Sequence, residues 1–138
     1  MTVTAEIEKL AKEEGLAVLG WRELPINSDS LGKTALSVMP QFKQLFVSGV
    51  KKESGIALDR LAFALRKRAE HSLDLYFPSL SSQTIVYKGM LTTGQLEEFF
   101  PDLSDERVVS PLALVHSRFF NKYIPFMATG PPISLHRT

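Results

Sequence analysis

The sequence predicts a layered α+β domain. Apolar residues recur at helical spacing over residues 3–14 and again over residues 58–73. Two shorter apolar runs, at residues 17–22 and 44–47, have the composition of β-strands. The expected order along the chain is helix, strand, strand, helix, hairpin, helix, strand. A length of 138 residues is that of one domain or a piece of one.

Turn-forming residues separate the first four elements. Gly15 follows the first helix at the position where helices commonly end. Residues 25–32 and 51–55 are polar and rich in turn-forming residue types, so both stretches are expected to be loops. Pro40 is better placed at the beginning of the second strand than inside it. The charged face of the long helix, at residues 66–70, is expected to be solvated rather than a binding patch.

The second half of the chain begins with a predicted β-hairpin. Two β-rich segments, at residues 76–80 and 84–88, flank a serine-rich turn at residues 81–83. Thr93 is the expected N-cap of a short helix over residues 94–99.

The candidate functional residues lie at the end of the last predicted strand, residues 112–119. Four apolar residues are followed there by His116, Ser117 and Arg118, as expected for a buried strand that emerges at a sheet edge or pocket. A guanidinium is costly to leave unpaired and can hold a carboxylate through two parallel hydrogen bonds. Arg118 therefore predicts either a site for a substrate carboxylate or an internal salt bridge with an Asp or Glu.

The composition argues against several classes of partner and location. With 16 basic and 15 acidic residues, the chain has no strong field that would attract nucleic acid or a membrane surface. It contains no apolar run of the roughly 18–20 residues needed to span a bilayer, and its acidic N-terminus is unlike a signal or transit peptide. A cytoplasmic location is therefore expected. Without cysteine, the chain has no disulfide and no thiol nucleophile.

Other familiar site patterns are missing from the sequence. No serine has the Gly-x-Ser-x-Gly surroundings of a nucleophile elbow. The histidines, His71, His116 and His136, lack metal-ligand spacing. The turn at residues 130–132 is Gly-Pro-Pro, which lacks the backbone N–H groups of a phosphate cradle. We expect neither a metal site nor a nucleotide site.

Four segments resemble the large subunit of glutamate synthase and follow the order of that family. They are residues 13–22, 80–90, 101–105 and 113–119. In that family they belong to the N-terminal class II glutamine amidotransferase domain. The resemblance implies part of an N-terminal-nucleophile hydrolase, a four-layer αββα sandwich, with a role in glutamate biosynthesis and nitrogen assimilation.

The resemblance also implies a reaction and its partners. In the family, an N-terminal cysteine attacks the side-chain amide of glutamine and releases ammonia. A synthase region with FMN and an iron–sulfur cluster then makes glutamate from 2-oxoglutarate; neither cofactor is expected in this stretch. The family's His-Ser-Arg-Phe strand corresponds to residues 116–119, so Arg118 is the one substrate-binding residue carried over, facing the α-carboxylate of glutamine. The implied partners are glutamine and the remaining regions of glutamate synthase.

Two family features of catalysis are missing. The chain has no cysteine, and it has no His-Asn-Gly-Glu motif to supply the oxyanion hole. The chain alone is therefore expected not to hydrolyse glutamine, and no catalytic residue is assigned. The alternative is a non-catalytic module that keeps the arginine and binds glutamine or docks on a synthase.

After Phe119 the sequence departs from the family pattern. Residues 120–128 can be back-translated as TTC AAC AAA TAC ATT CCC TTC ATG GCC, where degenerate third bases are a free choice. Reading this choice from the second base gives the family-like Ser-Thr-Asn-Thr-Phe-Pro-Ser-Trp. The Met127 codon followed by the G of the next codon leaves no choice but tryptophan in that frame. We therefore hypothesise a one-base insertion, with residues 1–119 as the central part of the amidotransferase domain and residues 120–138 as an out-of-frame tail, expected to be poorly ordered.

Overall fold

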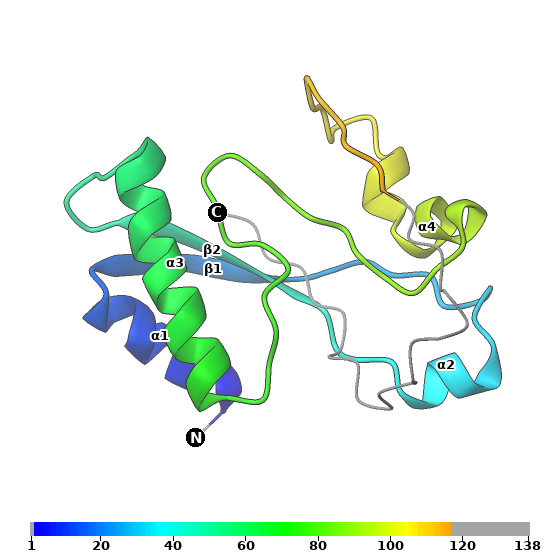
Figure 1. Cartoon of the computed structure of the whole chain (residues 1–138), viewed down its shortest axis with the longest axis horizontal. Coiled ribbons are helices and arrows are strands. Elements are labelled where there is room, and N and C mark those ends of the chain that lie inside the picture. The colour runs from blue at the N-terminus through cyan, green and yellow to red at the C-terminus, as the bar shows by residue number, and fades with distance from the viewer. Residues whose placement is uncertain (1, 117–138) are drawn as a thin grey trace. The chain divides into compact units, whose positions relative to one another are not determined.

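The computed structural model describes residues 2–116 (Figure 1). Its elements, in chain order, are α1 (Val3–Glu13), β1 (Leu16–Glu23), α2 (Lys33–Ser37), β2 (Lys43–Gly49), α3 (Gly55–Ser72), α4 (Thr93–Phe99) and the 3₁₀-helix η1 (Pro101–Ser104). The described residues form two compact units. The first unit contains α1, β1, β2 and α3, and the second contains α2, α4 and η1.

The first unit is built on a two-stranded antiparallel sheet. The register runs from Leu16 opposite Gly49 to Val18 opposite Val47, and it shifts by one residue before Gly20. Leu19 is the extra residue of this β-bulge, and 69% of its surface is exposed. Both predicted strands are confirmed, each slightly longer than its apolar run.

Two amphipathic helices complete the core of the first unit. The hydroxyl of Thr2 accepts a hydrogen bond from the Ala5 N–H at the start of α1, and the helix is followed by Gly15 at φ +78°, a conformation that glycine adopts without strain. Helices α1 and α3 pack against each other and against the sheet (Figure 1). The buried cluster consists of Ile7, Leu10, Ala11, Leu16, Leu45, Val47, Ala62, Leu65, Ala69, Phe77 and Leu80.

The predicted hairpin over residues 76–88 is wrong, because no strand forms there. The backbone is instead held by carboxylates on α3. Glu70 Oε1 accepts a hydrogen bond from the Phe77 N–H at 3.0 Å, and Asp59 Oδ1 accepts one from the Ser82 N–H at 2.5 Å. The segment is therefore fixed along the helix rather than in a sheet.

The turn of this segment nevertheless lies where the serines predict it. Ser79 Oγ accepts a hydrogen bond from the Val86 N–H at 3.1 Å. Lys88 Nζ lies 3.1 Å from Tyr76 Oη and 4.7 Å from the centre of the same ring. The two arms thus meet through side chains, without the backbone ladder of a hairpin.

The second unit is organised around α4. Its N-cap is Thr92, not Thr93 as expected, because both the backbone N–H and the hydroxyl of Thr92 donate to Gln95 Oε1 at 3.0 Å. Gln95 Nε2 also donates to the Ser30 carbonyl at 3.0 Å, which fixes the predicted loop before α2. Helix α2 was not expected; it has only 5 residues and buries none of them, so its sequence carries no amphipathic pattern.

The described part of the last predicted strand, residues 112–116, is not a strand and is not buried. Leu114 is 90% exposed, and Leu112 and Val115 are also largely exposed. A strand needs a partner for its backbone groups, and within residues 2–116 none pairs with this segment. The predicted tail, residues 120–138, lies outside the described residues.

The α+β prediction is confirmed at the level of a mixed fold with a small antiparallel sheet. Within the described range, no helix combines the length and apolar character needed to cross a bilayer.

Candidate functional site

The predicted site residue, Arg118, lies outside the described residues, as do Ser117 and Phe119. His116 is the last described residue and is exposed in irregular backbone. Whether Arg118 meets a substrate carboxylate or an internal acid therefore stays a prediction.

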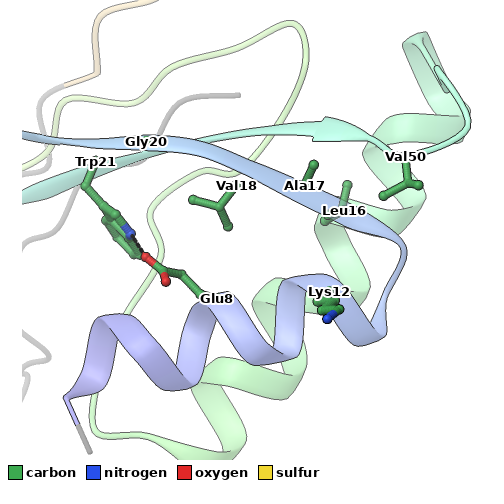
Figure 2. A pocket seen from close by; sticks show the side chains of 8 residues that line it. All are labelled: Glu8, Lys12, Leu16, Ala17, Val18, Gly20, Trp21 and Val50. Atoms are coloured by element: carbon green, nitrogen blue, oxygen red, sulfur yellow. Dashed lines mark hydrogen bonds between the residues drawn. The ribbon is translucent and has the colours of Figure 1, made fainter.

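The described residues contain a groove between α1 and β1, with a volume of about 490 Å³ (Figure 2). It is lined by Glu8, Lys12, Leu16, Ala17, Val18, Gly20, Trp21 and Val50. Leu16 to Val18 are consecutive in β1, and side chains alternate between the two faces of a strand. The groove therefore runs along the outer edge of β1 rather than over one face of the sheet.

The polar groups of the groove come mainly from α1. Glu8 and Lys12 are one turn apart and so share a face of the helix. The Trp21 indole extends from β1 toward α1 and donates from Nε1 to Glu8 Oε1 at 2.8 Å (Figure 2). The rest of the lining is mainly apolar, and it contains no serine, histidine or cysteine that could act as a nucleophile.

Sequence reasoning missed this groove. The available signals were the tryptophan at the exit of the first strand and the Glu8–Lys12 spacing on the first helix. Neither signal shows that the edge of β1 is open, because strand order is a property of the tertiary structure.

An ion-pair cluster joins the end of α1 to α3. Arg68 Nη1 lies 2.5 Å from Glu14 Oε1, and Nη2 lies 2.5 Å from Glu13 Oε2. The hydrogen bonds with Glu14 and then Glu13 raise the pKa of Arg68. Both carboxylates and the guanidinium are partly exposed, so this cluster fixes one helix to the other and is not a catalytic site.

The pKa of a second arginine, Arg107, is raised by a neighbour in the sequence. The Arg107 guanidinium donates from Nε to Asp105 Oδ1 and from Nη2 to Asp105 Oδ2, and these hydrogen bonds raise the pKa of Arg107. Both residues belong to one turn after η1, so the pair shapes that turn.

A buried polar contact lies across the sheet. Gln44 is only 2% exposed, and its Oε1 accepts a hydrogen bond from Arg22 Nη1 at 2.6 Å across the paired strands. A buried amide requires such a partner, and we assign this contact to the register of the sheet.

No group of three His, Cys, Asp or Glu side chains in residues 2–116 is placed to hold a metal ion.

Comparison with known families supplies the decisive observation. A family model described as glutamine amidotransferases class-II matches residues 1–135. The chain belongs to this family.

Relatives that are similar to this chain include glutamate synthases. The large chain of the NADPH glutamate synthase of Bacillus subtilis is 42% identical over 136 residues, which cover 94% of this chain. Ferredoxin-dependent glutamate synthase 1 of Arabidopsis thaliana is 40% identical over 134 residues, or 92% of the chain, and the NADPH large chain of Azospirillum brasilense is 34% identical over 127 residues, or 88%. The predicted resemblance to the amidotransferase domain of the glutamate synthase large subunit is confirmed.

This amidotransferase chain spans only a small part of those relatives. The matched region is 9% of the length of the Bacillus subtilis protein and 8% of each of the other two. Of the resembling segments, residues 13–22 cover the end of α1 and most of β1, residues 80–90 overlap the segment that α3 holds, and residues 101–105 contain η1. The fourth segment ends beyond the described residues.

Proposed function

We propose that this chain is a piece of the glutamine amidotransferase domain of a glutamate synthase, which works together with the remaining regions of that enzyme to release ammonia from glutamine. The observation that supports this most strongly is the match of the class II amidotransferase family across residues 1–135, together with about 40% identity to glutamate synthases. The matched stretch is about a tenth of those proteins, so the rest of the site and of the reaction belongs to other regions.

In this proposal, Arg118 binds the α-carboxylate of glutamine. A guanidinium presents two parallel N–H donors to a carboxylate, which fixes both the position and the orientation of the amino acid. That orientation presents the side-chain amide to a nucleophile supplied from outside this stretch, because the chain contains no cysteine.

The synthase half of the reaction is assigned to other regions of the parent enzyme. The flavin and the iron–sulfur cluster of those regions would supply the redox chemistry. This chain has no cysteine to hold a cluster. The role proposed for this stretch is limited to glutamine binding and the scaffold around it.

Two measurements on the purified chain test this proposal. We expect no ammonia release from glutamine above the buffer background, since the chain has neither the cysteine nor the His-Asn-Gly-Glu motif. We also expect no saturable heat of glutamine binding in calorimetry, because one arginine does not make a complete site. Ammonia release in proportion to the chain's concentration would contradict the proposal. Saturable binding without release would favour the alternative of a glutamine-binding module.

A further inference from the structure

Helix α3 presents an exposed stripe on the side opposite its buried face. The buried residues of the helix are Ala62, Leu65 and Ala69. Four exposed residues, spaced by four, three and four positions, share the opposite side, and we call them the α3 stripe: Ile56, Arg60, Phe63 and Lys67. Strands added beside β1 or β2 would lie in the plane of the sheet, against which the buried face of α3 packs. Such strands would leave the α3 stripe uncovered.

The α3 stripe combines apolar side chains with positive charge. Ile56 is 72% exposed, and Phe63 is 56% exposed. Arg66 Cζ and Lys67 Nζ lie 5.8 and 5.9 Å from the centre of the Phe63 ring, so this exposed aromatic side chain has cations beside it. Within residues 2–116, the Arg60 side chain forms no hydrogen bond or ion pair.

The two carboxylates of α3 are engaged beside the stripe. Asp59 accepts the Ser82 N–H at 2.5 Å, and Glu70 accepts the Phe77 N–H at 3.0 Å while also lying 3.4 Å from Lys67 Nζ. Both carboxylates thus serve the segment that follows α3. The positive charge of the α3 stripe is therefore available to an acidic partner.

The second unit carries a surface of opposite charge. Residues 92–106 contain five acidic residues and no lysine or arginine. Four exposed residues of this stretch form what we call the acidic surface: Glu97, Glu98, Leu103 and Glu106. The Ser104 hydroxyl donates to Glu97 Oε1 at 2.9 Å, which holds α4 beside η1.

The carboxylates of the acidic surface lie in an unfavourable position. Glu97 and Glu98 belong to the last turn of α4, where the negative end of the helix dipole disfavours carboxylates. In the described part of the chain, the Glu98 and Glu106 side chains form no hydrogen bond or ion pair. A cation placed against this surface would therefore relieve repulsion that the second unit leaves in place.

We propose that two copies of this chain associate through these surfaces, with the α3 stripe of one copy against the acidic surface of the other. Arg60 and Lys67 pair with the carboxylates, while Phe63 and Leu103 supply apolar contact between the charges. Charge complementarity selects this occupant, because every copy carries both surfaces.

The part of this chain that follows the described residues does not fit the α3 stripe. Residues 117–138 contain three basic residues and no acidic one, so they would repel the stripe. The inference also goes beyond the proposed function, because neither surface contains Arg118.

Sedimentation velocity of the full chain measures this association directly. The contact joins two different surfaces, so each copy can bind two neighbours, and the average mass should rise with concentration above the 15.4 kDa of one chain. Raising the salt from about 0.1 to 1 M shortens the Debye length from about 10 to 3 Å and should weaken the association about tenfold. Association that is unchanged by salt would contradict the inference.

Charge reversal tests each surface separately. Arg60→Glu alters the α3 stripe and Glu98→Lys alters the acidic surface, and each should weaken self-association about tenfold. An equimolar mixture of the two variants should recover the association, because the first keeps its acidic surface and the second keeps its α3 stripe. Lys12→Glu, at an exposed position on α1, is the charge-matched control and should associate like the wild type.

Phe63→Ala removes the apolar contact without changing the charge and should also weaken the association. It replaces any charge variant whose circular dichroism spectrum differs from that of the wild type. Three results would overturn the inference: the mass stays that of one chain at every concentration, the mixture associates no better than either variant alone, or Arg60→Glu and Lys12→Glu associate equally. None of these measurements involves glutamine, so failure here and failure of the proposed function are separate outcomes.

Discussion

Asp59 and Glu70 are separated by eleven residues of α3, about three helical turns, and therefore share one face of the helix. Each accepts a backbone N–H from the segment that follows, at Ser82 and Phe77 respectively. The predicted solvated face of α3 is correct for Lys67, whose side chain is 55% exposed, and wrong for Glu70, which is 18% exposed. Periodicity locates the helix face, but it does not reveal that a carboxylate on that face serves as a backbone acceptor.

At Glu70, substitution by alanine removes the acceptor of the Phe77 N–H. We expect Glu70→Ala to lower the free energy of unfolding by about 1 kcal/mol, since a hydrogen bond to a buried residue is lost. Asp74→Ala is the matched control, because Asp74 is exposed in the same segment. Urea denaturation followed by circular dichroism measures both variants. Equal stability of the two variants would show that the Glu70 contact is not stabilising.

At the scale of elements, local patterns predicted α1, α3, α4 and the two paired strands, whereas α2 was missed and the hairpin and the described part of the last strand were wrong. A helix satisfies its own backbone groups, so apolar spacing over residues 58–73 identifies α3 directly. Residues 84–88 have strand composition, but a strand exists only if a neighbour pairs with it. The Val86 N–H instead donates to Ser79 Oγ, and the Ser82 N–H just before this stretch donates to Asp59 on α3.

The fully buried Leu65 connects α3 to the sheet and α1 through the shared core. We expect Leu65→Ala to destabilise the first unit by about 2–5 kcal/mol through lost burial and the cavity left behind. Phe63→Ala on the same helix removes a side chain that is 56% exposed and should have a much smaller effect. Thermal and urea unfolding compare the two. A larger effect at Phe63 than at Leu65 would mean that α3 packs through its other face.

At the scale of the whole molecule, the chain leaves apolar surface for which the described residues supply no cover. Leu19, Val109 and Leu114 are exposed, and the sheet has two strands. The sequence predicts part of an amidotransferase domain by its resemblance to the family, and such a part leaves surface that the rest of the domain would cover. It did not locate the groove beside β1, because the openness of an edge depends on which strands lie next to it.

The reading-frame hypothesis makes a prediction about the tail. If residues 120–138 come from a shifted frame, they were not selected to pack on this domain. A chain that ends after Phe119 should then have the same circular dichroism spectrum and Tm as the full chain. A clearly lower Tm after truncation would contradict the hypothesis. Resequencing of the gene and of close relatives would also contradict it if no frame-restoring alternative is found.

The central claim is that residues 1–119 are a competent part of a glutamine amidotransferase site in which Arg118 binds substrate. The direct test replaces the aligned stretch of the Bacillus subtilis large chain with these residues and measures ammonia release from glutamine. We predict that the chimera releases ammonia and that Arg118→Ala raises its KM for glutamine by about 10- to 100-fold. Arg107→Ala, which loses only a local pair with Asp105, should leave the KM unchanged. A folded chimera without ammonia release, or an unchanged KM in Arg118→Ala, would contradict the claim.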